Sequence, residues 1–235
     1  MIRAAIMVGF FAVAAVPCAL VMFPWLWITG DAERLYRVGT WIGITGVRLA
    51  GVRVRLIGLD RFDHNRSYIF MSNHVSNLDP PVVIPNIPQR VSVLAKASLF
   101  RIPLLGYAMS KASLIPVHRE NREAAIQSIH NAVEVLRQGL SIVIFPEGTR
   151  SRTGELLPFK KGPFYMAEEA GVPVVPITVR NTAELMPKGK FEVRRGTVEV
   201  IFHDPIEPAQ CTDREELMSA VRNSILSGMH SVPSA

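Results

Sequence analysis

A long apolar run near the N-terminus is the clearest pattern in the chain. From Ala4 to Thr29 no side chain carries a charge. At about 1.5 Å per residue, a helix of that length exceeds the ~30 Å hydrocarbon core of a bilayer. Pro17 and Pro24 interrupt the run, and each removes a backbone donor and tends to kink a helix. The pattern predicts a helix that enters a membrane, either crossing it or folding back within it.

The segment after this run mixes apolar residues with arginines. Its apolar side chains recur at roughly helical spacing, and aromatic side chains suited to the headgroup level lie close by. The apolar positions are Leu35, Val38, Ile42, Leu49 and Val52, and the aromatic positions are Trp25, Trp27, Tyr36 and Trp41. This predicts an interfacial helix. We therefore divide the chain into an N-terminal membrane-anchoring helical segment, residues 1–51, and a second domain, residues 52–235.

Two other interpretations of the N-terminal run are open. A secretory signal peptide is one, because Arg3 begins a positive region and Ala12-Val13-Ala14 resembles a cleavage site. The apolar run continues well past Ala14, however, and this favours the membrane helix. A helix buried in a soluble core is the other interpretation, although the segment has no polar face.

Beyond residue 51, short apolar strands alternate with amphipathic helices. Seven segments have strand character, being short, apolar and bounded by turn residues. They are residues 52–57, 67–71, 91–95, 113–117, 140–145, 173–179 and 197–202. Between the fourth and fifth segments, apolar residues such as Ile129, Val133 and Leu136 recur at helical spacing after Asn121, a candidate N-cap.

Two more helices are predicted near the C-terminus. The first is predicted over residues 161–170 and stops at Gly171. The second begins after Thr212 and Glu215, which are spaced as a capping box and are followed by an amphipathic pattern. Strands that alternate with helices indicate an α/β domain with a mixed, largely parallel sheet flanked by helices.

Charge and cysteine usage narrow the function classes. The formal net charge of +6 and the isoelectric point near 9.7 indicate attraction to anions such as nucleic acid, acidic lipid headgroups or phosphorylated substrates. Cys18 and Cys211 form no CxxC pair and no Cys/His cluster at metal-ligand spacing. We therefore expect neither a disulfide framework nor a metal site.

The first polar motif is His74 followed five residues later by Asp79, on the loop that leaves the second predicted strand. On a continuous helix the two side chains would lie about 140° apart, and Pro80 biases Asp79 away from the helical region. They can meet only across a turn, where Asp79 would orient the imidazole as a general base. The alternatives are a structural histidine and an aspartate that caps a helix beginning at Pro80.

The second polar motif, Phe145 to Ser151, follows the apolar strand that ends near Phe145. Gly148 permits a sharp turn, Arg150 has the planar fork that clamps phosphate, and Glu147 is a hydrogen-bond acceptor. The alternative is a surface ion pair at a strand end, worth only about 0–1 kcal/mol. The same candidate site could also receive positive charge from Lys96, Arg119, Lys160 and Lys161.

These motifs resemble the glycerolipid acyltransferase family, especially its bacterial 1-acyl-glycerol-3-phosphate acyltransferases. Four family blocks occur in order, and the resemblance extends over nearly the whole chain because Phe159-Lys160-Lys161-Gly162 and the apolar N-terminal anchor also look like the family. The four blocks are NHVSNLD at residues 73–79, SLIPVHR at 113–119, FPEGTRS at 145–151 and VPVVPI at 172–177. In the second block, Ser113 and His118 stand where the family pattern has Gly and Asp, while Arg119 fits.

The resemblance implies direct acyl transfer from a thioester to a lysolipid hydroxyl, with His74 as the general base and Asp79 orienting it. Arg119 and Arg150 would hold the acceptor phosphate, with Lys96 as a further candidate. Glu147 would help place the glycerol portion of the acceptor, and Gly148 and Thr149 are further substrate-binding candidates. The 172–177 block would shape an acyl tunnel or the sheet packing. A serine nucleophile is the rival mechanism, but no GxSxG elbow is present and Ser76 reads as a turn residue.

The leading functional hypothesis is a 1-acylglycerol-3-phosphate O-acyltransferase on the cytoplasmic face of a bacterial inner membrane. It would convert lysophosphatidic acid and acyl-CoA or acyl carrier protein to phosphatidic acid, at the bilayer and with no cofactor. A second hypothesis changes the acceptor to lyso-ornithine lipid or another lysophospholipid. A basic membrane-associated binding protein is the non-enzyme alternative. Nucleic acid is not an expected partner, because the basic residues are spread along the chain without a recognised motif.

Overall fold

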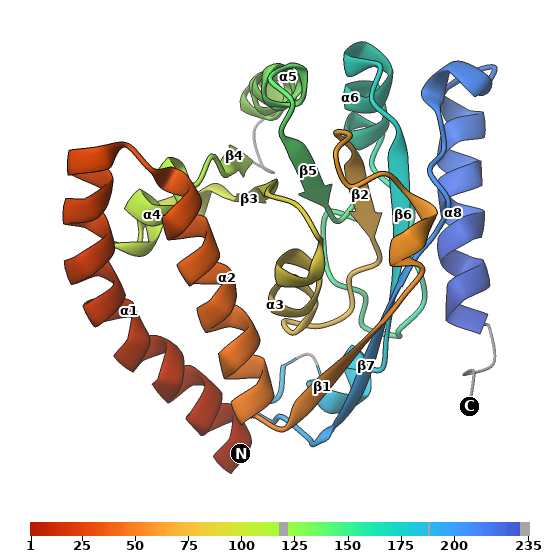
Figure 1. The fold of residues 1–235 in the computed structure, drawn as a ribbon. Coiled ribbons are helices and arrows are strands. Elements are labelled where there is room, and N and C mark those ends of the chain that lie inside the picture. Colours follow the sequence, from red (N-terminus) through yellow and green to blue (C-terminus); the bar gives the residue numbers. More distant parts are fainter. Residues whose placement is uncertain (118–121, 188, 231–235) are drawn as a thin grey trace.

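The computed structural model describes residues 1–117, 122–187 and 189–230. Its centre is one seven-stranded sheet with the order β1-β7-β6-β2-β5-β3-β4 (Figure 1). The strands are β1 (Val52–Ile57), β2 (Ile69–Ser72), β3 (Val91–Lys96), β4 (Ile115–Val117), β5 (Ser141–Ile144), β6 (Val174–Arg180) and β7 (Gly196–Phe202). Among the described strands, β6 and β7 pair antiparallel and all other neighbours pair parallel. The predicted mixed, largely parallel sheet is confirmed.

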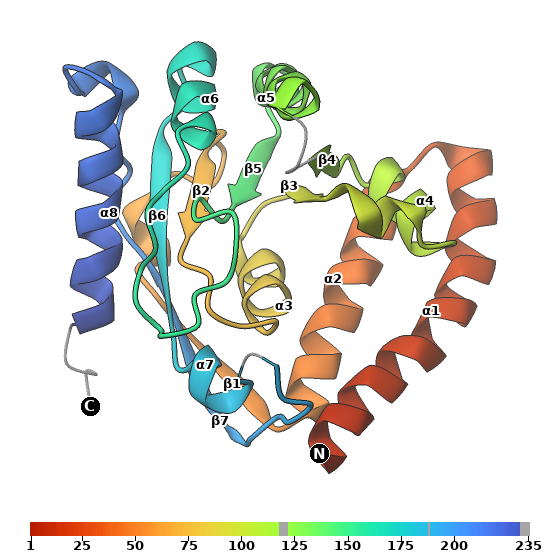
Figure 2. The same cartoon turned by 180° about the vertical axis from the view of Figure 1, so that it is seen from behind.

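Helices flank both faces of this sheet. They are α1 (Ile2–Thr29), α2 (Ala32–Leu49), α3 (Asp79–Val83), α4 (Leu105–Lys111), α5 (Arg122–Arg137), α6 (Gly162–Ala170), α7 (Thr182–Leu185) and α8 (Arg214–His230). Figures 1 and 2 show α1, α2 and α3 on one side of the sheet and α5, α6 and α8 on the other. Because both faces are covered, the central strands read in the sequence as continuous apolar runs.

Successive side chains of the central strands pack into two different hydrophobic cores. Phe70 and Val143 belong to the core shared with α2 and α3, whereas Ile69 and Ile142 belong to the core under α5, α6 and α8. Successive strand residues point to opposite faces, so each of these strands contributes to both cores. The first four residues of β6, Val174 to Ile177, are fully buried and pair with β2. This part of the 172–177 block therefore serves sheet packing.

The capping prediction for α8 is wrong by one residue. Asp213 accepts a hydrogen bond from the Glu216 backbone N–H at 2.8 Å, and the Glu216 carboxylate reaches back to the Thr212 backbone N–H. Glu215 instead pairs with Lys161 on the surface. An aspartate next to the first turn offers a charged acceptor to the free N–H groups, and it takes the capping position in place of the threonine. The predicted cap of α5, Asn121, lies outside the described residues.

The two N-terminal helices form a hairpin. Asp31 begins α2 by accepting hydrogen bonds from the backbone N–H groups of Glu33 and Arg34. A Cβ at Gly46 would overlap the Phe11 ring, so this glycine lets α1 and α2 approach closely. α1 is continuous through both prolines and bends along its length in Figure 1.

Most of α1 is exposed and apolar. By length and composition it is the one helix in the described part of the chain that could cross a membrane. Only 17% of its most apolar 18-residue window is buried in the protein, so the alternative of a soluble core helix is wrong. Its exposed side chains include Val13, Val16, Leu20, Val21, Trp27 and Ile28. The signal-peptide alternative and the domain boundary at residue 51 stay predictions.

Candidate active site

His74 lies on the loop that connects buried strand β2 to helix α3. The start of this loop is fixed to β6 by the side-chain amide of Asn73, which donates to the Val179 carbonyl at 2.9 Å and accepts from the Val179 N–H at 2.7 Å. A side-chain amide can bond to both the N–H and the carbonyl of one backbone residue when that residue's strand runs beside it. The direction of the His74 loop is therefore set by strand pairing.

The prediction that His74 and Asp79 meet across a turn is confirmed. Asp79 Oδ2 accepts from His74 Nδ1 at 2.7 Å and from the backbone N–H groups of Val75 and Ser76, each at 2.7 Å. The capping alternative is wrong, because Asp79 is itself the first residue of α3 and its carboxylate holds the turn before it. Asp79 is fully buried, so these three donors replace the water that it would otherwise bind.

Thr182 is a site residue that the sequence does not reveal. It lies in α7, directly after β6, and its hydroxyl donates to Asp79 Oδ1 at 2.5 Å. Both side chains are fully buried. The two residues are more than a hundred positions apart, and no local motif marks the threonine. Its hydrogen bond occupies the second carboxylate oxygen and so fixes the orientation of the whole Asp79 group.

The other nitrogen of His74 is available for chemistry. A carboxylate only accepts hydrogen bonds, so Nδ1 carries the proton of this contact, and in the neutral imidazole Nε2 is the nitrogen with the free lone pair. Nε2 has no hydrogen-bond partner in the described part of the chain, and the side chain is 14% exposed. The ring stacks on Phe145, with centroids 4.3 Å apart and an interplanar angle of 27°. The imidazole is thus held on one side and reachable on the other, as a general base must be.

Glu147 joins two loops at this place. One carboxylate oxygen accepts from the His74 backbone N–H at 2.6 Å, and the other accepts from the Leu157 backbone N–H at 2.9 Å. Burial raises the pKa of the Glu147 carboxyl, and the hydrogen bonds from Leu157 and His74 oppose that rise. The alternative of a surface ion pair is wrong for this residue, because its side chain is buried. Its oxygens position the His74 loop in this structure.

The rest of the second motif also reaches the His74 loop. Gly148 has a φ of +69°, which confirms the predicted sharp turn. The Ser151 N–H donates to the His74 carbonyl at 2.8 Å, and Arg150 Nη1 donates to Asn77 Oδ1 at 2.7 Å. Thr149 is exposed on the same turn. The structure thus brings the two sequence motifs together as one site.

The remaining basic candidates fall in different places. Lys96 is exposed at the carboxyl end of β3, on the sheet edge where β2 and β5 also end. Lys160 lies beside Gly148. Lys161 pairs with Glu215 on the surface. Arg119 and His118 lie outside the described residues.

Ser113 shows why the family pattern has glycine at that position. Its φ is +65°, a left-handed conformation that glycine adopts without strain and serine does not. Two contacts hold it there: Arg90 Nη2 donates to its hydroxyl at 3.3 Å, and the Ser92 hydroxyl donates to its carbonyl. The same conformation delays the start of β4 by two residues relative to the predicted strand.

The Ser76 hydroxyl does not face the imidazole. It donates to the Met186 carbonyl at 2.8 Å and accepts from the Leu78 N–H at 3.2 Å. Both contacts stabilise the turn between His74 and Asp79, as predicted for a turn residue. This geometry gives no support to a serine nucleophile paired with His74.

A mainly apolar cavity of about 550 Å³ adjoins the site. Its size is within the range of small-ligand pockets. It lies between the ends of β3 and β5 and helices α5 and α6, and its lining includes Leu94, Ile129, Ile144, Phe145, Met166 and Lys160. Phe145 also stacks on His74, so one ring contacts both the imidazole and the cavity.

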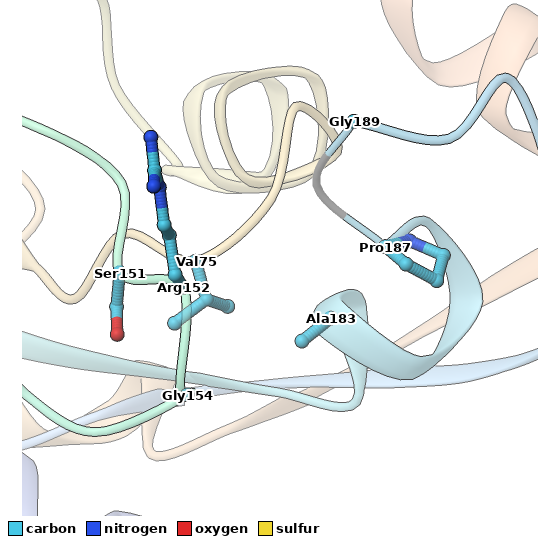
Figure 3. Close-up of a pocket in the computed structure, with 7 residues that line it drawn as sticks. All are labelled: Val75, Ser151, Arg152, Gly154, Ala183, Pro187 and Gly189. Atoms are coloured by element: carbon cyan, nitrogen blue, oxygen red, sulfur yellow. The ribbon is translucent and has the colours of Figure 1, made fainter.

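A second cavity of about 450 Å³ lies on the α7 side of the loop. Figure 3 shows Val75, Ser151, Arg152 and Gly154 on one side of it and Ala183, Pro187 and Gly189 on the other. Val75 directly follows His74 and Ala183 directly follows Thr182, so this cavity borders both loops that hold Asp79. Among residues 1–117, 122–187 and 189–230, no three His, Cys, Asp or Glu side chains gather closely enough to hold a metal ion.

Known proteins match this chain over the same elements. The family model described as Acyltransferase matches residues 53–180, from β1 to the end of β6, and contains both polar motifs. A chloroplastic 1-acyl-sn-glycerol-3-phosphate acyltransferase of Brassica napus is 37% identical over 165 residues, which are 70% of this chain and 47% of that protein. The chain thus spans about half the length of this plant relative.

Matches to bacterial proteins cover a larger share of the matched protein's own length. A 1-acyl-sn-glycerol-3-phosphate acyltransferase of Borreliella burgdorferi is 31% identical over 186 residues, which are 78% of this chain and 74% of that protein. The crystal structure of the 1-acyl-sn-glycerophosphate (LPA) acyltransferase PlsC from Thermotoga maritima matches with a TM-score of 0.80 and 26% identity. That match covers 97% of this chain and 95% of the other.

Proposed function

The chain belongs to the acyltransferase family, and from this premise we propose that it transfers a fatty acyl group from an acyl thioester to the sn-2 hydroxyl of 1-acyl-glycerol-3-phosphate. The product is phosphatidic acid. The names of the plant and bacterial relatives support this acceptor. The observation that carries the proposal is the His74 ring, which is 14% exposed, has Nδ1 held by buried Asp79, and stacks on Phe145 at the wall of an apolar cavity.

The proposed reaction needs one base and no covalent enzyme intermediate. The acceptor hydroxyl donates its proton to His74 Nε2 as its oxygen attacks the thioester carbonyl carbon. The tetrahedral intermediate then collapses, the C–S bond breaks, and the departing sulfur takes the proton from Nε2. Asp79 stabilises the transient imidazolium, and Glu147 and Thr182 keep both partners in place.

Arg150 is the proposed holder of the acceptor phosphate. Its guanidinium reaches the His74 loop through Asn77, and a planar fork binds phosphate in two parallel hydrogen bonds. Lys96, at the carboxyl end of β3, is proposed as an additional positive charge. Arg119, which lies outside the described residues, is proposed as a further phosphate-binding residue on the family resemblance alone. The apolar cavity beside Phe145 is the proposed space for an acyl chain.

We propose that α1 and the segment around α4 form the membrane-contacting surface. Tyr107 of α4 packs against Phe23 and Trp27 of α1. Exposed apolar side chains continue from α1 onto this segment at Leu99, Ile102, Leu104 and Leu105. A contiguous apolar surface of this kind marks a membrane or protein contact. Membrane contact is favoured here, because the proposed lipid acceptor is itself located in the membrane. Attachment to the cytoplasmic face of a bacterial inner membrane is part of the proposal.

The test is acyl transfer by the purified full chain. Acyl-CoA or acylated acyl carrier protein is mixed with lysophosphatidic acid, lyso-ornithine lipid or lysophosphatidylcholine, and thiol release and product mass are measured. We expect phosphatidic acid as the main product. Preference for another lysolipid would select the alternative acceptor, and binding of lipids without thiol release from any donor would select the non-enzyme alternative.

Arg150→Ala is expected to raise the KM for lysophosphatidic acid about 10- to 100-fold, since a hydrogen-bonded charged pair contributes roughly 1.5–3 kcal/mol. The kcat should change less, because Arg150 is proposed to bind the ground state and the transition state alike. Arg137→Ala, which removes an exposed arginine on α5, is the matched control. An unchanged KM in Arg150→Ala would contradict the phosphate role.

A further inference from the structure

A basic groove of about 800 Å³ lies at the end of the helical hairpin away from its turn. Figures 1 and 2 show the start of α1, the end of α2 and the start of β1 side by side at this place. Four arginines from four segments line the groove. They are Arg3 of α1, Arg48 in the last turn of α2, Arg53 of β1 and Arg195 directly before β7. None of its described lining residues is acidic.

The positive charge of this groove is not balanced by carboxylates. In the described part of the chain, none of the four arginines forms an ion pair, whereas nine other arginines do. Arg3 and Arg195 come together over Gly51, where a Cβ would overlap the Arg3 guanidinium and touch Arg195 Cγ at 3.5 Å. Arg3 Nη1 donates to the Ala50 carbonyl at 3.3 Å. Four arginines lining one groove without carboxylate partners give it the charge that attracts a phosphate, and each guanidinium can bind phosphate oxygens through its planar fork.

The floor of the same groove is apolar. Edge strand β1 contributes Val54 and Leu56, both half-buried, and α2 contributes Ile44 and Leu49. A free phosphate would use only the arginines. A molecule with a phosphate head and hydrocarbon chains would use the arginines and the floor together.

The groove also opens next to the helix proposed to contact the membrane. Ile2 and Ile6 flank Arg3 on α1 and are 78% and 45% exposed. We propose that the groove binds the phosphate of an anionic membrane phospholipid, at a site separate from the active site. The proposal rests on the membrane contact through α1 and does not depend on the reaction.

Helix α3 lies between the two sites. Pro81 and the neighbouring Asn86 line the groove, while Asp79, at the start of the same helix, is buried and bonded to His74. None of the proposed active-site residues that the structure describes lines the groove. Lipid bound in the groove and lipid bound at the active site can therefore be separated by substitution.

The test uses the full chain in an uncharged detergent and measures binding without turnover by titration calorimetry. Ligands are dioctanoylphosphatidylglycerol, dioctanoylphosphatidylcholine and glycerol 3-phosphate. The variant Arg53→Gln with Arg195→Gln is expected to bind the phosphatidylglycerol at least 10-fold more weakly than the unaltered chain, because an arginine near anionic lipid contributes roughly fivefold in affinity. Arg34→Gln with Arg37→Gln removes the same charge from α2 outside the groove and should change the affinity less than twofold. All four positions are exposed or partly exposed, and thermal unfolding checks that both variants are folded.

Each alternative gives a distinct result. Equal losses of phosphatidylglycerol affinity in the two double variants would show general charge attraction and would overturn the proposal of a specific site. No loss in Arg53→Gln with Arg195→Gln would place the lipid elsewhere, including the active site, and would also overturn it. Glycerol 3-phosphate binding as tightly as the lipid would show that the ligand is a free phosphate. A failed acyltransferase assay together with the expected binding pattern would reject the proposed function and leave the groove assignment in place.

Discussion

His74→Ala is expected to lower kcat by about 10²- to 10⁴-fold, which is the usual contribution of a general base. The substitution removes a partly exposed imidazole whose Nδ1 is oriented by a buried carboxylate. KM for lysophosphatidic acid should change little, because the proposed phosphate contacts come from Arg150. Thiol release at saturating concentrations of both substrates measures the effect.

The control for this prediction is His130→Ala. His130 is a half-exposed histidine on α5, opposite Glu169, and its loss should leave kcat unchanged. Circular dichroism and thermal unfolding of both variants show whether the fold is kept. Turnover at the level of the unaltered chain in folded His74→Ala would remove the base from the mechanism. Trapping of an acyl group on the protein would favour a covalent route instead.

Asp79→Asn is expected to lower kcat about 100-fold or more while the protein stays folded. The asparagine carbonyl can accept from the Val75 and Ser76 N–H groups as Oδ2 does now, and its amide can donate to the Thr182 hydroxyl, which also accepts. The turn is thereby preserved. What disappears is the negative charge that stabilises the imidazolium during transfer. Steady-state kcat and the free energy of unfolding separate the two effects.

Thr182→Val is the companion variant. It removes the hydrogen bond to Asp79 Oδ1 but keeps the carboxylate charge and nearly the same side-chain volume. We expect a loss of about 1.5–3 kcal/mol in the free energy of unfolding, as for a hydrogen bond to a charged group, and a smaller fall in kcat than in Asp79→Asn. If Asp79→Asn kept full activity and Thr182→Val only reduced stability, the carboxylate would be a turn-stabilising group and nothing more.

The sheet and its helices follow from patterns that are local in the sequence. The central strands are continuous apolar runs because both of their faces are covered, and α5 and α6 show their inward faces at helical spacing. The end of α6 at Gly171, with a φ of +62°, follows from the conformational freedom of that residue alone. The helix caps were less predictable. Thr212, Asp213, Glu215 and Glu216 could all supply capping groups, and the geometry of one turn decided among them.

The site shows the same division between local and distant contacts. His74 and Asp79 are five residues apart and would point in different directions on a continuous helix, so a turn between them was predictable. The bias of Asp79 away from the helical region that Pro80 suggested is wrong, because Asp79 is the first residue of α3. The sequence also proposed Glu147, but as a group that contacts substrate. In the structure its two oxygens hold backbone N–H groups of two loops. That contact depends on β2 and β5 being parallel neighbours with their carboxyl ends at one edge.

Contiguous stretches of the chain predict the apolar α1, the α/β order of elements and the two polar motifs, because each of these depends on residues of one segment and not on contacts between distant ones. The tertiary structure decided the partners of those motifs. Thr182 reaches Asp79, Asn73 reaches Val179, and Arg3 meets Arg195 over Gly51, all across more than a hundred residues. Such contacts arise when packing of the sheet and helices brings distant segments together. The free energy that favours these contacts comes from packing of the whole core, so it cannot be read from any short segment of the sequence.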